Sequence, residues 1–199
     1  MTTPHERRPG AADVDVRPLP LNTPIGPGAW HSVGSRPEPG NTAITWELTD
    51  SQHPGRLFFG AKNTERRSVL LGISGERTEH FDAFSPEPFT LTGFNGVEAG
   101  EARVFAGSIF GQSSPVDFPG SVIAAELRIK PHEEFVFVID SSLAHAVLSV
   151  DQELYLEDIS LQPETMGYVN EGVRTLHMIN PGDNPALALV LGAPSISEV

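Results

Sequence analysis

The chain has 199 residues, enough to bury one sizeable core or two smaller cores that pack together. It contains no cysteine, which excludes disulfides, thiolate metal sites and thiol nucleophiles and fits a reducing compartment such as the cytoplasm. Its formal net charge is -13 at pH 7, so most of the surface would repel nucleic acid and anionic membranes.

The N-terminus carries charges and prolines where a secretory signal needs a continuous apolar stretch. No apolar run in the sequence approaches the roughly 20 residues that span a bilayer. We therefore expect a cytoplasmic protein that binds neither nucleic acid nor a membrane.

Residues 1–40 are rich in proline, which fixes the backbone φ angle and removes a hydrogen-bond donor. Such a segment disfavours helices and regular sheet ladders alike. We predict a tail followed by an extended arm, in which apolar residues such as Val16, Leu19 and Ile25 could lie along the edge of a sheet.

From Thr42 onward, short apolar or alternating runs stand between turn residues, and no window keeps helical spacing for three turns. The predicted strands cover residues 43–48, 56–59, 68–73, 89–92, 102–109, 122–129, 134–139, 144–150, 166–169, 175–179 and 186–191. Residues 151–158 and 159–165 are ambiguous, because their apolar residues fit either a strand or a turn of helix. Many short strands predict an all-β sandwich or barrel, and a similar rhythm in both halves predicts two β-units in tandem.

The second half contains three notable phrases: RVFAGSIFGQSSPV at residues 103–116, ELRIKP at 126–131, and LVLGAP at 189–194, followed by Glu198. Together they resemble the C-terminal domain of the pirins, a family of the cupin superfamily. The resemblance covers residues 101–199 and implies the cupin double-stranded β-helix, or jelly roll. Residues 41–100 would then be a reduced cupin-like unit, so that the whole chain is bicupin-like.

The first half contains the phrases WEL at residues 46–48, RSVLLGISG at 67–75 and PFTLTG at 88–93. These phrases are similar to the metal-poor bicupins of the HutD/Ves type, which is a second resemblance. Residues 41–100 are therefore either a degenerate pirin cupin or a unit of the HutD type, and both interpretations imply the same superfamily.

The pirin resemblance also implies a metal site in the first unit, built on a His-x-His pair and a Gly-x-Gly-x-x-His-Ser-Glu element. No histidine in the chain has a second histidine two positions on, so no strand can direct two imidazoles at one ion. GPGAWHS at residues 26–32 echoes the second element, but Val33 stands where the resemblance calls for Glu. We expect no metal cofactor; the alternative is Fe, Ni or Cu held by the scattered His31, His53 and His80.

Four polar residues stand inside otherwise apolar strands: Glu47, Glu126, His145 and His177. A buried polar group needs a hydrogen-bonding partner, and a cupin barrel has room for one small molecule. These four residues are therefore the candidate ligand-binding residues, although a surface position or a satisfied core position would explain each of them as well. His132-Glu133-Glu134 could begin a metal site, but a solvated turn explains that triplet equally.

These patterns favour a metal-poor, pirin-like cupin that binds a small molecule or another protein. Two alternatives stay open: a metal-dependent oxygenase of the pirin type, resembling quercetin dioxygenases, and a metal-free isomerase that uses a His and a Glu. The apolar strand expected at residues 134–139 could form an exposed sheet edge, and it predicts a homodimer.

Overall fold

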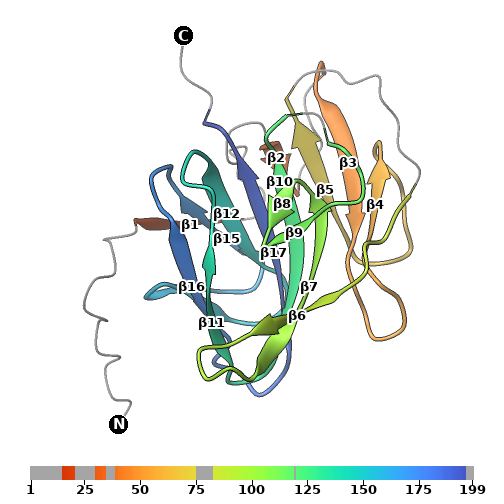
Figure 1. The fold of residues 1–199 in the computed structure, drawn as a ribbon. Coiled ribbons are helices and arrows are strands. Elements are labelled where there is room, and N and C mark those ends of the chain that lie inside the picture. The colour runs from red at the N-terminus through yellow and green to blue at the C-terminus, as the bar shows by residue number, and fades with distance from the viewer. Residues whose placement is uncertain (1–14, 21–29, 35–38, 75–82, 119, 196–199) are drawn as a thin grey trace.

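The computed structural model describes residues 15–20, 30–34, 39–74, 83–118 and 120–195 (Figure 1). Every regular element in these ranges is a β-strand, and nearly all pairings are antiparallel, which confirms the all-β prediction. None of the described residues belongs to a helix of the length and hydropathy needed to cross a membrane.

A seven-stranded sheet, here called the main sheet, runs through the centre in the order β1-β15-β12-β17-β10-β7-β6. Its strands are β1 (Val16–Pro20), β6 (Phe89–Thr92), β7 (Glu98–Ala106), β10 (Ile123–Ile129), β12 (Ala144–Ser149), β15 (Thr165–Val169) and β17 (Ala186–Ala193). The predicted division after residue 100 falls inside β7.

Two four-stranded sheets flank the main sheet (Figure 1). The N-terminal sheet, in the order β2-β5-β3-β4, consists of β2 (Trp30–Val33), β3 (Thr42–Glu47), β4 (Arg56–Phe59) and β5 (Ser68–Ile73). The outer sheet, in the order β11-β16-β13-β14, consists of β11 (Glu134–Val138), β13 (Leu154–Leu156), β14 (Ile159–Leu161) and β16 (Thr175–Ile179). A small hairpin of β8 (Ser108–Ile109) and β9 (Gln112–Ser113) completes the elements.

Alternate residues of the central strands belong to two different cores. In β17, Ala188 and Val190 pack with residues of the outer sheet, whereas Leu187, Leu189 and Leu191 pack with the N-terminal sheet. Because both faces of the main sheet are covered, every residue of β12 and β17 is buried. The main and outer sheets together enclose the first core, and we call them the C-terminal barrel.

The predicted strands correspond to observed strands with ends that differ by a few residues. The arm predicted along a sheet edge is confirmed for β1, whose prolines Pro18 and Pro20 are tolerated because an edge strand can dispense with donors. The ambiguous segments form the hairpin of β13 and β14. Within the expected arm, Trp30–Val33 is a strand paired with β5, which the prediction missed.

The outer sheet ends in β11, the segment from which a homodimer was predicted. Its pairing with β16 is bounded by two backbone hydrogen bonds, from Ile139 N–H to Arg174 O and from Asn180 N–H to Glu133 O. In this register the odd-numbered residues of β11 bond to β16. The backbone groups of Val136 and Val138 therefore point away from β16, toward the open edge. Their side chains are 41% and 72% exposed, and among the described residues no backbone hydrogen bond occupies this edge, which thus combines open backbone groups with apolar surface.

We predict that two copies pair through β11 around a two-fold axis at Val136, which would bring the same valines together. The change Val136→Lys should weaken the dimer roughly tenfold, because a lysine on an edge strand opposes pairing. Size-exclusion chromatography with light scattering over a concentration series measures this. Gln112→Lys, an equal charge change on exposed β9, is the control, and a wild-type protein that is monomeric at every concentration would contradict the prediction.

Candidate functional site

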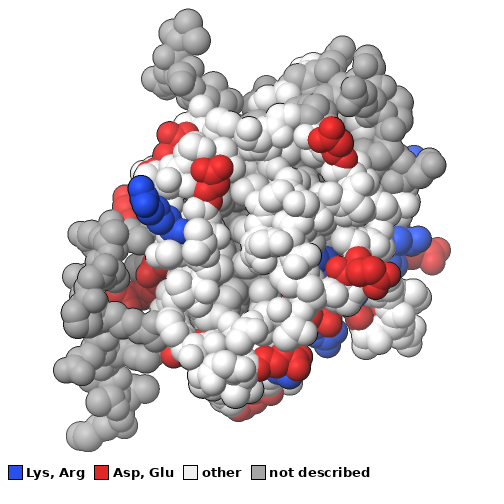
Figure 2. Space-filling view, in the orientation of Figure 1, with Lys and Arg blue, Asp and Glu red and all other residues white. Residues whose placement is uncertain are grey.

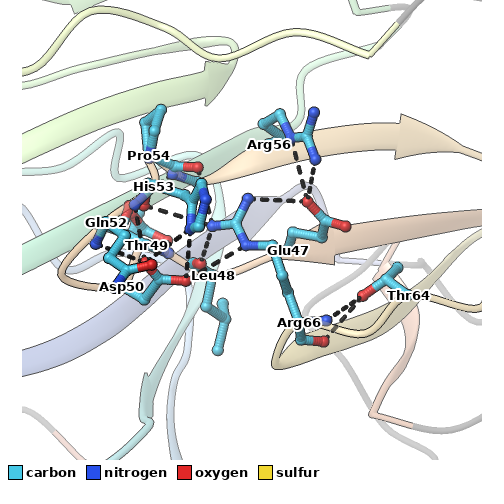
Figure 3. A network of polar contacts seen from close by, with 12 residues as sticks. Glu47, Leu48, Thr49, Asp50, Gln52, His53, Pro54, Arg56, Thr64 and Arg66 are labelled. Atoms are coloured by element: carbon cyan, nitrogen blue, oxygen red, sulfur yellow. Dashed lines mark hydrogen bonds and ion pairs between the residues drawn. The ribbon is translucent and has the colours of Figure 1, made fainter.

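Glu47, the last residue of β3, is buried and forms ion pairs with Arg66, which is largely buried, and with Arg56, which is partly exposed (Figure 3). Its Oε2 accepts hydrogen bonds from Arg56 Nε and Nη2 at 3.1 and 2.9 Å and from Arg66 Nη1 at 3.0 Å. Arg66 Nη2 also donates to the carbonyls of Leu48 and Pro54, at 2.8 and 3.1 Å. Glu47 thus anchors the loop between β3 and β4.

Glu126 reaches the same loop from the other side, from β10 of the main sheet. Its Oε2 accepts the backbone N–H of Thr49 at 3.1 Å, and its Oε1 accepts the Thr49 hydroxyl. A side chain at Gly55 would begin 2.9 Å from the Glu126 carboxylate, so this close approach requires glycine. Burial raises the pKa of Glu126, while the Thr49 hydrogen bonds and the charges of Arg103 and Arg66 act in the opposite direction.

The structure therefore brings two of the four predicted site residues, Glu47 and Glu126, to one loop. Each of these carboxylates already accepts hydrogen bonds from neighbouring protein groups. Their arrangement positions the loop and ties the N-terminal sheet to the main sheet.

His145 lies elsewhere, inside the C-terminal barrel. It is fully buried on the face of β12 that also bears Val147, between its cross-strand neighbours Val169 and Gly192. A Cβ at Gly192 would stand 3.0 Å from the imidazole, so glycine makes room for the ring. Neither ring nitrogen has a hydrogen-bond partner in the described part of the chain. Burial lowers the pKa of His145 to about 4, against weaker opposing contributions from the Leu143 backbone and Asp140.

His177 lies on the outer sheet and contacts none of the other three. Its Nε2 lies 3.1 Å from Glu134 Oε2, its backbone N–H donates to Glu157 Oε1 at 2.8 Å, and its ring packs edge-on to Phe94. The four predicted residues thus occupy three separate places.

The histidines of the alternative metal site are only partly within the described ranges. His53 is exposed and its Nδ1 lies 3.2 Å from Asp50 Oδ1. The side chain of His31, which belongs to β2, and all of His80 fall outside the described residues. His132 contacts Asp183 at 2.9 Å. Among the residues that the structure describes, no three His, Asp or Glu side chains are grouped as metal ligands.

A pocket of about 280 Å³ opens where the N-terminal sheet meets the main sheet. Its lining comes from the loop after β3, the residue before β5, β10, the turn after β12, and the start of β17. The residues are Leu48, Thr49, Asp50, Ser51, Arg67, Arg128, Asp151, Pro185 and Leu187. The sequence analysis missed this pocket. The signal available was Arg128, a second charged residue two positions after Glu126 in an apolar strand.

No protein-family model matches the chain, and no curated protein matches it. Solved structures of similar fold include a quercetin 2,3-dioxygenase from Acinetobacter baumannii, with a TM-score of 0.63 and 13% identity over 92% of this chain and 78% of that one. GK1651 from Geobacillus kaustophilus gives a TM-score of 0.59 and 13% identity over 96% and 80% of the two chains. YhhW from Escherichia coli gives a TM-score of 0.51 and 9% identity over 95% of this chain and 79% of that one. These likenesses span both halves of the chain and concern the fold.

The buried ion pairs of Glu47 lead to a prediction about stability. Glu47→Gln should lower the free energy of unfolding by about 2–4 kcal/mol, because it leaves the largely buried Arg66 with only its longer contact to Asp50, at 3.4 Å. Urea denaturation measures the loss. Glu98→Gln, which removes the exposed pair with Lys130, should cost less than about 0.5 kcal/mol. Equal losses in the two variants would show that Glu47 is not an anchor.

The buried imidazole of His145 predicts a pH dependence. Because its pKa falls from 6.5 to about 4 on folding, the unfolded state binds more protons between these values, and stability should decrease as pH falls through this window. The burial of His145 should lower the free energy of unfolding by an amount on the order of 3 kcal/mol near pH 4, and it should have no such effect above pH 7.

Urea denaturation at a series of pH values, with His145→Leu as the comparison, isolates this contribution. The raised pKa of Glu126 acts with the opposite sign but is common to both proteins. The variant should lose less stability than the wild type between pH 7 and pH 4. Identical slopes would contradict the assigned burial of a neutral imidazole.

Proposed function

We infer that this chain, whose fold is that of the pirin-like bicupins as its sequence predicted, is a non-catalytic module that binds a small molecule. The observation that supports this function is the pocket between the N-terminal sheet and the main sheet. The pocket uses residues from five separate segments, so it exists only when the two sheets are packed together.

The lining of the pocket has the character of a ligand site. Leu48, Pro185 and Leu187 supply apolar surface, and Arg67 and Arg128 supply charged donors. Small-molecule sites combine such apolar walls with a few polar groups that fix orientation. The volume of about 280 Å³ is near the lower limit of ligand pockets, which favours a small molecule.

The predicted polar residues support binding over catalysis. General acid–base chemistry needs side chains that are free to exchange a proton with a substrate. Glu47 is held by two arginines, Glu126 by Thr49, and His177 by Glu134. Three of the four candidates are thus engaged in holding the fold.

A metal-dependent oxygenase is the alternative, because one protein of similar fold is a quercetin 2,3-dioxygenase. That likeness, at 13% identity, concerns the fold. In this chain the alternative would depend on His31 and His80 together with His53, which already contacts Asp50. Ligand binding that persists after treatment with a chelator separates the binding module from a metal-dependent site.

The proposed function predicts that a small polar compound raises the unfolding temperature through this pocket. Thermal unfolding of the chelator-treated full chain is measured with organic acids, amino acids, sugars and nucleosides, since a ligand of the folded state stabilises it by mass action. Ser51→Trp should abolish the shift by filling the pocket, whereas Gln112→Trp on exposed β9 should not change it. The proposal fails if no compound shifts the transition or if Ser51→Trp leaves the shift unchanged.

A further inference from the structure

Arg128 is a charged residue of the pocket wall that forms no ion pair with any of the described residues. It lies on the face of β10 that turns toward the N-terminal sheet and is partly buried at the pocket wall. Among the described residues, no hydrogen bond or ion pair reaches its guanidinium. Glu101 lies opposite it in the register with β7 but beyond ion-pair distance, and Glu126 is held by Thr49. A partly buried cation without a partner favours an anionic group on a ligand.

Arg67 adds a second guanidinium to the pocket. Its Nη2 donates to the carbonyl of Val150 at 2.6 Å, which fixes the side chain against the end of β12. Its contact with Glu164 is long, at 3.7 Å, and both side chains are exposed there. A guanidinium has five N–H donors, so Arg67 keeps donors for a ligand. Arginine matches a planar carboxylate with two parallel hydrogen bonds.

Two carboxylates line the same pocket, and only one of them is fully engaged. Asp50 Oδ1 accepts the N–H groups of Gln52 and His53, both at 2.8 Å, and these bonds help to lower the pKa of Asp50. Asp151 Oδ1 accepts the N–H of Leu187 at 2.9 Å. Within the described ranges, Asp151 Oδ2 has no partner, which leaves it as an acceptor for a ligand donor.

The charges of the pocket balance, with two arginines against two aspartates. A dianion such as phosphate would meet repulsion from both aspartates and from a protein whose net charge is -13. On the face seen in Figure 2, acidic side chains are spread around the margin, and no strongly basic cluster offsets them. A ligand of zero net charge with separated charged groups suits this environment best.

We propose that the pocket binds a small zwitterion of the α-amino acid class, an inference that rests on the proposed binding function. The carboxylate lies on Arg128 and Arg67, the ammonium group donates to Asp151, and the side chain contacts Leu48 and Leu187. A molecule that carries only one of the two charges would leave either the arginines or Asp151 without a ligand partner and should bind more weakly.

Isothermal titration with each of the common α-amino acids, using the full chain, tests the inference. The best binder is then compared with its methyl ester, which lacks the carboxylate, and with its deaminated acid, which lacks the ammonium group. Both should bind at least roughly tenfold more weakly than the amino acid itself, the loss expected for one charge-assisted hydrogen bond. Inorganic phosphate and glucose are the probes for other ligand classes.

Two variants test which protein side chain binds the carboxylate of the ligand and which binds its ammonium group. Arg128→Met should weaken the amino acid at least roughly tenfold, while Lys130→Met, the same charge change on a residue that does not line the pocket, should leave its affinity unchanged. Asp151→Asn keeps the acceptor for the Leu187 N–H and should weaken the amino acid but not its deaminated acid. Arg128→Met should fold normally, since the guanidinium has no hydrogen bond or ion pair to a described residue, and an unchanged circular dichroism spectrum checks this.

The outcomes separate the inference from the function on which it rests. If phosphate or glucose binds in a manner that Ser51→Trp abolishes, and no amino acid does, the pocket is a binding site but the zwitterion assignment is wrong. If Arg128→Met and Lys130→Met bind the amino acid equally, the assignment is also wrong. If no probe binds at all, both the function and the assignment fail.

Discussion

The structure depends on the burial of the main sheet on both faces. Strands β10, β12 and β17 pack against the outer sheet with one set of alternate residues and against the N-terminal sheet with the other. Such strands must be apolar throughout, because a polar group on either face loses water and needs another partner. Three exceptions on these strands are therefore informative: Glu126 is bonded to a loop, Arg128 borders a pocket, and the ring nitrogens of His145 have no hydrogen-bond partner among the described residues.

The same burial explains why the small N-terminal sheet must stay in place. Without this sheet the leucines of β17 would be exposed to water, at a free-energy cost of about 2 kcal/mol for each fully buried side chain. Specific contacts fix its position: Trp30 Nε1 donates to Gly192 O at 3.0 Å, and the ring of Trp46 packs 4.7 Å from that of Phe105. In the described part of the chain this sheet has four strands, and the pocket forms where it meets the main sheet.

The strands could be predicted from sequence because each is a short apolar run between turn residues, and a period of two needs no knowledge of the fold. Trp30–Val33 was missed because prolines and glycines surround it, and its pairing with β5 depends on residues that follow much later in the chain. For the site, polarity inside a strand correctly marked Glu47 and Glu126 as unusual. It could not show that arginines and Thr49 satisfy them, because those partners come from other strands and loops.

Arg128 was overlooked for a related physical reason. An arginine in a strand usually extends to solvent along its aliphatic stem, so the sequence gives no sign that its charge is unpaired. Glu126 lies two positions away on the same face and would be its natural partner, but the Thr49 hydroxyl and N–H hold that carboxylate at the loop. The contact that ties the two sheets together thus also leaves a guanidinium available at their junction. The pocket is for this reason a property of the packed sheets, because its lining comes from both of them.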